Sequence, residues 1–180
     1  MVTLNTGRLV LREFTAEDFD AVHRYTTDPE VYKYQPWGPN TVKDTSDFIQ
    51  GAISRRLKKS RDDFELAVEH PESGLIGGCG IFVTSEGKGE IGYTLRKDMW
   101  GKGYGTEVVG ALIHFGFHQL GLHRIEASCD IRNVGSYRVM EKNGMTREGT
   151  LRENKKIHGE WRTSYIYGIL DREFWDCTRK

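Results

Sequence analysis

The stretch Trp100-Gly101-Lys102-Gly103-Tyr104-Gly105-Thr106-Glu107 decides the fold of this chain. Three glycines alternate there with a lysine and a tyrosine, directly before a helical pattern of apolar residues. Glycine allows unusual backbone angles and close approach by another group. The helix that follows begins with unpartnered N–H groups and a partial positive charge. The stretch therefore predicts a nest for an anion, above all a phosphate or pyrophosphate; the alternative is a tight turn that binds nothing.

Helix and strand patterns surround this turn on both sides. Before it, the periodicities predict a strand at 9–14, a helix from the N-cap Thr15 to about 28, an irregular loop at 34–39, a helix at 42–59, and strands at 64–68, 75–83 and 90–95. After it, they predict a helix closed by Gly121, a strand at 123–130, a helix at 133–143, and strands at 145–151 and 163–170. We expect one α/β (α+β) domain over 1–180, whose mixed sheet is antiparallel first and parallel where the long helix crosses over.

The bulk composition restricts the class of protein. The 180 residues match one ordinary domain, and 37% hydrophobic and 29% charged residues are typical of a soluble globular chain. Lysine plus arginine and aspartate plus glutamate both number 26, so the formal net charge is +0. General nucleic-acid binding is disfavoured because such proteins usually carry a basic excess. An anion must therefore be held by a local site.

The cysteines and the termini point to the cytoplasm. Cys79, Cys129 and Cys177 are odd in number and widely spaced, which favours a reducing compartment over a disulfide framework. The first residues lack the sections of a signal peptide, and no apolar run approaches the roughly 20 residues of a membrane helix. We expect a cytoplasmic protein without membrane attachment.

Two common phosphate motifs do not fit the turn. A Walker loop needs Ser or Thr after its Gly-Lys pair, but Gly103 follows Lys102. The dinucleotide fingerprint needs a glycine where Thr106 stands and has no series of hairpin strands before it. An acid, Glu126, does lie about 20 residues on, as that fingerprint requires, so a nicotinamide cofactor stays a minor alternative.

A second group of residues, at the two ends of the predicted helix 133–143, narrows the choice of phosphate-containing ligand. Asn133-Val134-Gly135-Ser136 opens the short helix, and Glu141-Lys142-Asn143-Gly144-Met145 closes it. With these segments the chain resembles the GNAT superfamily of acetyl-CoA-dependent N-acetyltransferases. The stretches 8–12, 90–93, 100–104 and 159–161 further resemble the branch that acetylates the N-termini of ribosomal proteins. The resemblance implies a mostly antiparallel sheet of about six to seven strands flanked by helices, with strands splayed at the cofactor site.

The resemblance also implies acetyl-CoA as co-substrate and assigns its binding residues. Backbone N–H groups of the glycine-rich turn would hold the pyrophosphate, while 95–96 would run along the pantetheine arm as an added strand. Asn133 matches the family position that hydrogen-bonds this arm, although asparagine is also a favoured N-cap. The implied cofactor-binding set is Leu95, Arg96, Gly101, Lys102, Gly103, Tyr104, Gly105, Thr106, Asn133 and Ser136.

The implied reaction is direct attack of a primary amine on the thioester. The amine must first lose a proton, because α-amines have a pKa of about 8 and lysine about 10.4. Glu90 matches a strand acid that relatives use and is the preferred general base, ahead of Glu126 and Glu107; the alternative is a solvated charge at the strand edge. Met140 stands where many relatives place a tyrosine acid, so Ser136 becomes the candidate donor to the leaving thiolate, with Tyr137 as fallback.

The acceptor is the least determined part of the site. Tyr34, Trp37 and Trp161 are candidates for its pocket, or they are only core residues. The branch favours a protein N-terminal α-amine; a small amine (polyamine, amino acid or aminoglycoside) and a non-catalytic acyl-CoA sensor remain alternatives. No metal is expected, because the pair His114 and His118 lacks a third ligand. The late strands are compatible with a homodimer.

Overall fold

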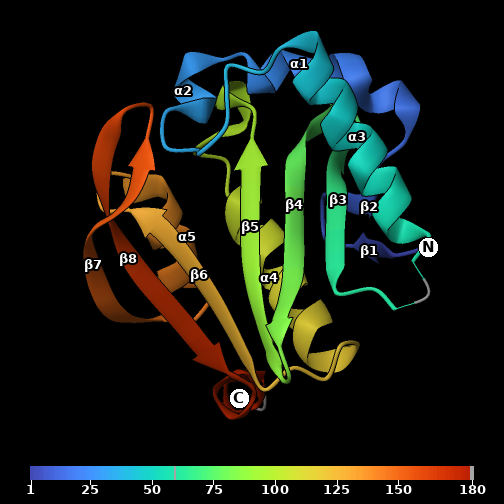
Figure 1. The fold of residues 1–180 in the computed structure, drawn as a ribbon. Helices are drawn as coiled ribbons and strands as arrows, with labels where there is room; N and C mark the ends of the chain where they lie inside the picture. The colour runs from blue at the N-terminus through green and yellow to red at the C-terminus, as the bar shows by residue number, and fades with distance from the viewer. Residues whose placement is uncertain (59, 179–180) are drawn as a thin grey trace.

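The computed structural model describes residues 1–58 and 60–178, with side chains described through 174. Six α-helices, two short 3-10 helices and eight strands make up this part of the chain (Figure 1). In chain order they are β1 (Thr3–Asn5), β2 (Val10–Glu13), η1 (Ala16–Asp18), α1 (Phe19–Thr26), α2 (Pro29–Tyr32), α3 (Val42–Arg56), β3 (Asp63–His70), β4 (Gly74–Ser85), β5 (Lys88–Leu95), η2 (Lys97–Met99), α4 (Tyr104–His118), β6 (Arg124–Asp130), α5 (Val134–Lys142), β7 (Thr146–Ile157), β8 (Glu160–Leu170) and α6 (Asp171–Thr178).

The strands form one sheet in the order β1-β2-β3-β4-β5-β6-β8-β7. Every neighbouring pair is antiparallel except β5 and β6, which are parallel and joined by the crossover through α4. That parallel pairing covers only Lys88–Glu90 against Arg124–Glu126. Beyond it the two strands diverge, so β5 and β6 open like a V (Figure 1). The mixed sheet and the splayed strands are as predicted.

Helices cover both faces of the sheet and define two apolar clusters. On one face, α4 packs so closely that a Cβ at Gly116 would lie 2.7 Å from Ile125 and 2.8 Å from Ile81. On the other face, α1 and α3 cover β2–β4, and Phe14, Val22 and Ile49 form the second cluster. The apolar periodicity of these helices explains their placement, because each buries one stripe against the sheet.

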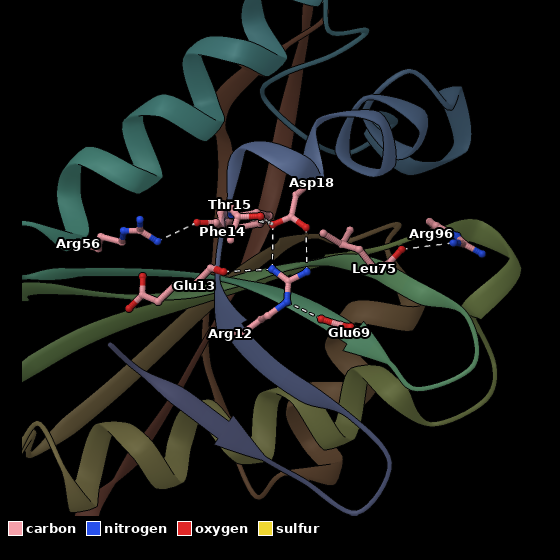
Figure 2. A network of polar contacts seen from close by, with 9 residues as sticks. All are labelled: Arg12, Glu13, Phe14, Thr15, Asp18, Arg56, Glu69, Leu75 and Arg96. Carbon is pink, nitrogen blue, oxygen red and sulfur yellow. Dashed lines mark hydrogen bonds and ion pairs between the residues drawn. The ribbon is translucent and has the colours of Figure 1, made fainter.

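A charged network fixes the entry from β2 into the first helices (Figure 2). The Arg12 guanidinium donates to both carboxylate oxygens of Asp18, at 2.9 and 2.8 Å, and also bonds Glu69 on β3. Asp18 in turn accepts from the Thr15 backbone N–H at 2.8 Å, as expected for an N-cap followed by an acid three positions on. These contacts tie the start of the first helices to β2 and β3.

The structure differs from the predicted elements mainly at the margins. The sheet has eight strands where six to seven were expected, because the three-residue strand β1 is too short to show a period. Strand β7 reaches Ile157 instead of 151, and nearly all its residues are exposed, so no apolar alternation marks it. Helix α3 ends at Arg56, while residue 59, its predicted end, lies outside the described residues, as does the Cys177 side chain.

Candidate functional site

The glycine-rich turn is built as its sequence requires. Gly101 and Gly103 have φ angles of 73° and 85°, in the left-handed region that favours glycine. Gly103 is also the N-cap of α4, and it provides no side-chain cap. Gly105 serves close packing instead, since a Cβ there would lie 3.1 Å from the Tyr93 ring and 3.3 Å from Val139. The turn therefore brings the start of α4 against β5 and α5 without a capping side chain over its first N–H groups.

Charged groups from the N-terminal segment hold this turn in place. Glu107, in the first turn of α4, accepts from the Arg8 backbone N–H at 2.7 Å and from Arg8 Nε at 2.9 Å, and it also bonds the Thr6 hydroxyl. Arg8 Nη1 donates to the Lys102 carbonyl at 3.1 Å, and its guanidinium lies 4.5 Å from the centre of the Tyr104 ring. Burial raises the pKa of Glu107, but these hydrogen bonds outweigh it and leave the pKa below its ordinary value. Glu107 is thus committed to a structural ion pair.

A cavity of about 1280 Å³ runs from this turn through the opening between β5 and β6 to the face covered by α1–α3. The loop at 34–39 bounds it, and Gln35 anchors that loop by a 3.4 Å hydrogen bond to the Thr94 hydroxyl of β5. On the opposite side His158, in the β7–β8 turn, contacts the Tyr32 carbonyl at 3.4 Å. The cavity is lined by these predicted site residues: Tyr34, Trp37, Leu95, Gly101, Gly103, Tyr104, Gly105, Thr106, Asn133 and Ser136.

The edge of β5 that faces the opening carries backbone groups with which β6 does not pair, because the pairing of the two strands stops at Glu90. The Arg96 N–H donates to the Ile76 carbonyl of β4 at 2.8 Å. Since backbone groups alternate between the two edges of a strand, Leu95, Tyr93 and Ile91 direct theirs to the opposite edge. The Leu95 carbonyl accepts the Trp100 indole N–H at 2.9 Å, which agrees with this orientation. The edge can therefore pair with an extended, amide-containing ligand.

Asn133 and Ser136 line the same cavity from the start of α5. Asn133 Oδ1 accepts from the Ser136 backbone N–H at 3.2 Å, so it caps the helix, while its Nδ2 has no partner among the described residues. Burial raises the pKa of Tyr93 to about 12, although a hydrogen bond with the Ser136 side chain opposes the rise. The Tyr93 hydroxyl thus keeps its proton near neutral pH. Tyr93 lines the cavity and is the functional candidate that strand periodicity alone did not single out.

Five predicted site residues lie outside the cavity lining. Glu90 is exposed on β5, opposite Glu126 in the parallel pairing, and it has no ion pair or hydrogen bond among the described residues. Tyr137 packs edge-to-face on Tyr165 at 5.8 Å. The side chains of Arg96 and Lys102 contact other residues: Arg96 pairs with Asp98 at 2.6 Å, and Lys102 Nζ lies 3.8 Å from Met99 Sδ. Trp161 is 61% exposed to solvent.

Some charged residues of the cavity wall have ion-pair partners among the described residues, and others do not. Arg138 and Lys142 of α5 line the cavity and have no carboxylate partner among the described residues. They lie beside the glycine-rich turn, because Asn143 Nδ2 donates to the Thr106 carbonyl at 3.2 Å. An anion at the start of α4 would therefore meet a helix N-terminus and these two cations.

Other candidate features do not build a second site. His114 and His118 stack on each other with ring centroids 4.0 Å apart, and no group of three or more His, Cys, Asp or Glu fit for a metal occurs in the described part of the chain. Cys79 and Cys129 are buried, and burial raises the pKa of both thiols. None of the helices described is long and apolar enough to cross a membrane.

Comparison with known proteins agrees with this geometry. The acetyltransferase (GNAT) domain profile matches residues 8–146. The uncharacterized N-acetyltransferase p20 of Bacillus licheniformis is 37% identical over 177 residues, which cover 97% of this chain and 99% of that protein. The crystal structure of a GNAT-family acetyltransferase from Bacillus anthracis superposes with a TM-score of 0.84 at 35% identity, covering 95% of this chain and 99% of that one.

More distant structures share the fold. They include a spermidine N-acetyltransferase from Vibrio cholerae in complex with CoA and spermine (TM-score 0.80, 19% identity, 93% and 98% of the two chains). They also include a ribosomal L7/L12 α-N-protein acetyltransferase in complex with coenzyme A (TM-score 0.83, 17% identity, 94% and 98%). The glycine-rich turn, the opened sheet and these matches lead to one conclusion: the chain belongs to the GNAT family of N-acetyltransferases.

Proposed function

We propose that this protein transfers the acetyl group of acetyl-CoA to a primary amine by direct attack in a ternary complex. One observation carries the proposal: the glycine-rich turn, the edge of β5 that β6 leaves unpaired beyond Glu90, and Ser136 line the same cavity. In coenzyme A a pyrophosphate joins the adenosine part to an amide-containing arm that ends in a thiol. The turn, the edge and the serine hydroxyl offer groups of matching chemistry.

The cofactor would be bound mainly by backbone groups. N–H groups of 101–106 would hold the pyrophosphate, assisted by Arg138 and Lys142. Leu95 would pair with the pantetheine arm, and Asn133 Nδ2, which has no partner among the described residues, would donate to one of its carbonyls. When bound, acetyl-CoA supplies the activated acetyl group.

Three groups of the chain would serve the chemistry. Glu90, the carboxylate on β5 without a partner among the described residues, would accept the amine proton through water. Backbone N–H groups on the open edge would stabilise the developing oxyanion. Ser136 would donate to the leaving thiolate, and the protonated Tyr93 hydroxyl beside it could restore the serine proton.

The acceptor we favour is an N-terminal α-amine, on the resemblance to the ribosomal-protein branch. Its neutral form is populated at neutral pH, because its pKa is about 8. A small-molecule amine is the second candidate, since a spermidine N-acetyltransferase has the same fold. The loop that contains Tyr34 and Trp37 would bound the acceptor half of the cavity in both cases, so these two residues do not distinguish the candidates.

Thiol release tests the proposal directly. The purified protein is incubated with acetyl-CoA and a panel of peptides and small amines, and free CoA is measured. Amine-dependent release supports acetyl transfer. Tight CoA binding without release for every amine would refute it in favour of a non-catalytic sensor.

A further inference from the structure

The acceptor half of the cavity has a floor made of glycines. Gly78 and Gly80 of β4 and Gly92 of β5 line it, on the sheet face covered by α1 and α3. A Cβ at Gly78 would touch Phe14 and the Tyr25 hydroxyl at 3.2 Å, and one at Gly80 would lie 2.9 Å from the Phe82 ring. A Cβ at Gly92 would meet nothing within 4 Å. The floor is thus covered over β4 and open over β5, next to the edge where the acetyl group would lie.

Aromatic rings form the walls above this opening. Trp37, Phe48 and Phe82 line the cavity and are only half-buried, so each leaves apolar surface toward the open space. Phe48 is fixed by edge-to-face contact with Phe14 at 5.2 Å. Rings held on such a wall gain free energy when an apolar group covers them. The walls therefore suit an apolar group of about the size of an aromatic ring.

The charged residues of the cavity lining also favour an acceptor with an uncharged neighbouring group. Its carboxylates are Glu30, Asp44, Glu65 and Asp130, and each already has a partner. Glu65 pairs with Arg55, Asp130 with Arg132 at 2.8 Å, Glu30 with Lys97 at 3.6 Å, and Asp44 accepts from the Thr41 N–H at 2.9 Å in a helix cap.

A second ammonium group on the acceptor would therefore have to compete for an occupied carboxylate. Glu90, which has no partner among the described residues, lies outside the lining and is assigned to the reacting amine. A polyamine carries additional positive charges that would lose hydration in the cavity without gaining a free counter-charge. The lining disfavours polycations.

We infer that the acceptor is a primary amine whose neighbouring group is uncharged, apolar and of aromatic-ring size, seated over Gly92 between Trp37, Phe48 and Phe82. This inference rests on the proposed acetyl transfer and names its substrate class. The same chemistry can come from a small arylalkylamine or from a peptide that begins with a large apolar residue.

Matched acceptors test the inference in the thiol-release assay. We expect kcat/KM for 2-phenylethylamine to exceed that for spermidine about tenfold or more, and a peptide beginning with Phe to exceed the same peptide beginning with Ser by a similar factor. Comparing the amine with the Phe peptide distinguishes the two sources. Higher kcat/KM for spermidine would overturn the inference while leaving acetyl transfer intact.

A pair of glycine variants tests the position. Gly92→Val adds volume only to the open floor and should raise KM for the preferred acceptor about tenfold, with KM for acetyl-CoA unchanged. Gly149→Val is the matched control, because Gly149 is also a strand glycine whose Cβ would meet nothing within 4 Å, and it lies outside the cavity lining. Equal effects of the two variants, or no effect of Gly92→Val, would overturn the placement.

Calorimetry separates failure of the pocket from failure of catalysis and does not depend on either variant. 2-Phenylethylamine and spermidine are titrated into the wild-type protein saturated with CoA. Tighter binding of 2-phenylethylamine supports the pocket even if no amine releases thiol, in which case only the proposed transfer is refuted. Tighter binding of spermidine, or no binding of 2-phenylethylamine, refutes the pocket.

Discussion

The glycine-rich turn allows a sharp test of the anion site through Gly101→Ala. Gly101 has φ 73°, and an alanine in the left-handed region costs about 1–2 kcal/mol. For a chain of this size that free energy corresponds to a fall in Tm of about 2–8 °C. The added methyl meets no protein atom within 4 Å and would extend into the cavity, where the pyrophosphate would lie.

The expected binding effect is larger than the strain alone explains. Displacing one N–H···phosphate hydrogen bond costs about 1.5–3 kcal/mol, since the acceptor is charged. The Kd for CoA, measured by titration calorimetry, should therefore rise about tenfold or more. Circular dichroism melting of the same samples gives the accompanying change in Tm.

Gly121→Ala is the matched control. Gly121 has φ 63°, its Cβ would also meet nothing within 4 Å, and it lies beyond the other end of α4, outside the cavity lining. It should lower Tm by a similar amount and leave the Kd for CoA unchanged. If both variants weaken CoA binding equally, or if Gly101→Ala binds CoA as the wild type does, the turn is not the phosphate site.

Three further predictions address the ion pair between Glu107 and Arg8 and the proposed chemistry. Glu107→Gln should lower the free energy of unfolding by about 1–2 kcal/mol at pH 7, measured by urea unfolding. The pKa of Glu107 lies below its ordinary value in the folded protein, so the difference from wild type should vanish as the pH falls through that lowered pKa. A difference that stays constant with pH would contradict this. Glu90→Gln should lower turnover by about 10²-fold or more and change the pH–rate profile, whereas an unchanged profile and turnover would exclude Glu90 as the base. Ser136→Ala should lower kcat about tenfold with little change in the Kd for CoA, and unchanged kcat would remove Ser136 as the thiolate donor.

Much of the fold could be predicted from short stretches of sequence, because its turns, helices and most of its strands depend on neighbouring residues. The alternating glycines at 101–105 predicted unusual backbone angles before a helix, and Gly101 and Gly103 have left-handed angles directly before α4. The parallel crossover followed from the long apolar helix between two strands. Strand β7 was truncated in the prediction because its side chains face solvent, so burial does not pattern its sequence.

The residues that share the site were harder to predict from the sequence, because they depend on which strands lie next to each other in the sheet. The alternation within β5 puts Gly92 and Tyr93 on opposite faces, but only the pairing with β4 shows that Gly92 shares its face with Phe82. Similarly, no spacing rule reveals that Asp130 is already neutralised by Arg132 and Arg162. The roles predicted for Tyr137 as a thiolate donor and for Trp161 in the acceptor pocket stay predictions.

The short pairing of β5 with β6 has a consequence for ligand binding. Only three residue pairs join the two strands, so few backbone hydrogen bonds hold β1–β5 to β6–β8 within the sheet. A ligand that bonds the edge of β5 and also contacts Ser136 would add contacts across this short pairing. The stability that such a ligand adds is set by its concentration and its Kd for the folded protein, so any cost of restraining the two strands is already contained in that Kd. Two compounds of equal Kd should therefore stabilise the protein equally, whether they contact β5 alone or both β5 and α5.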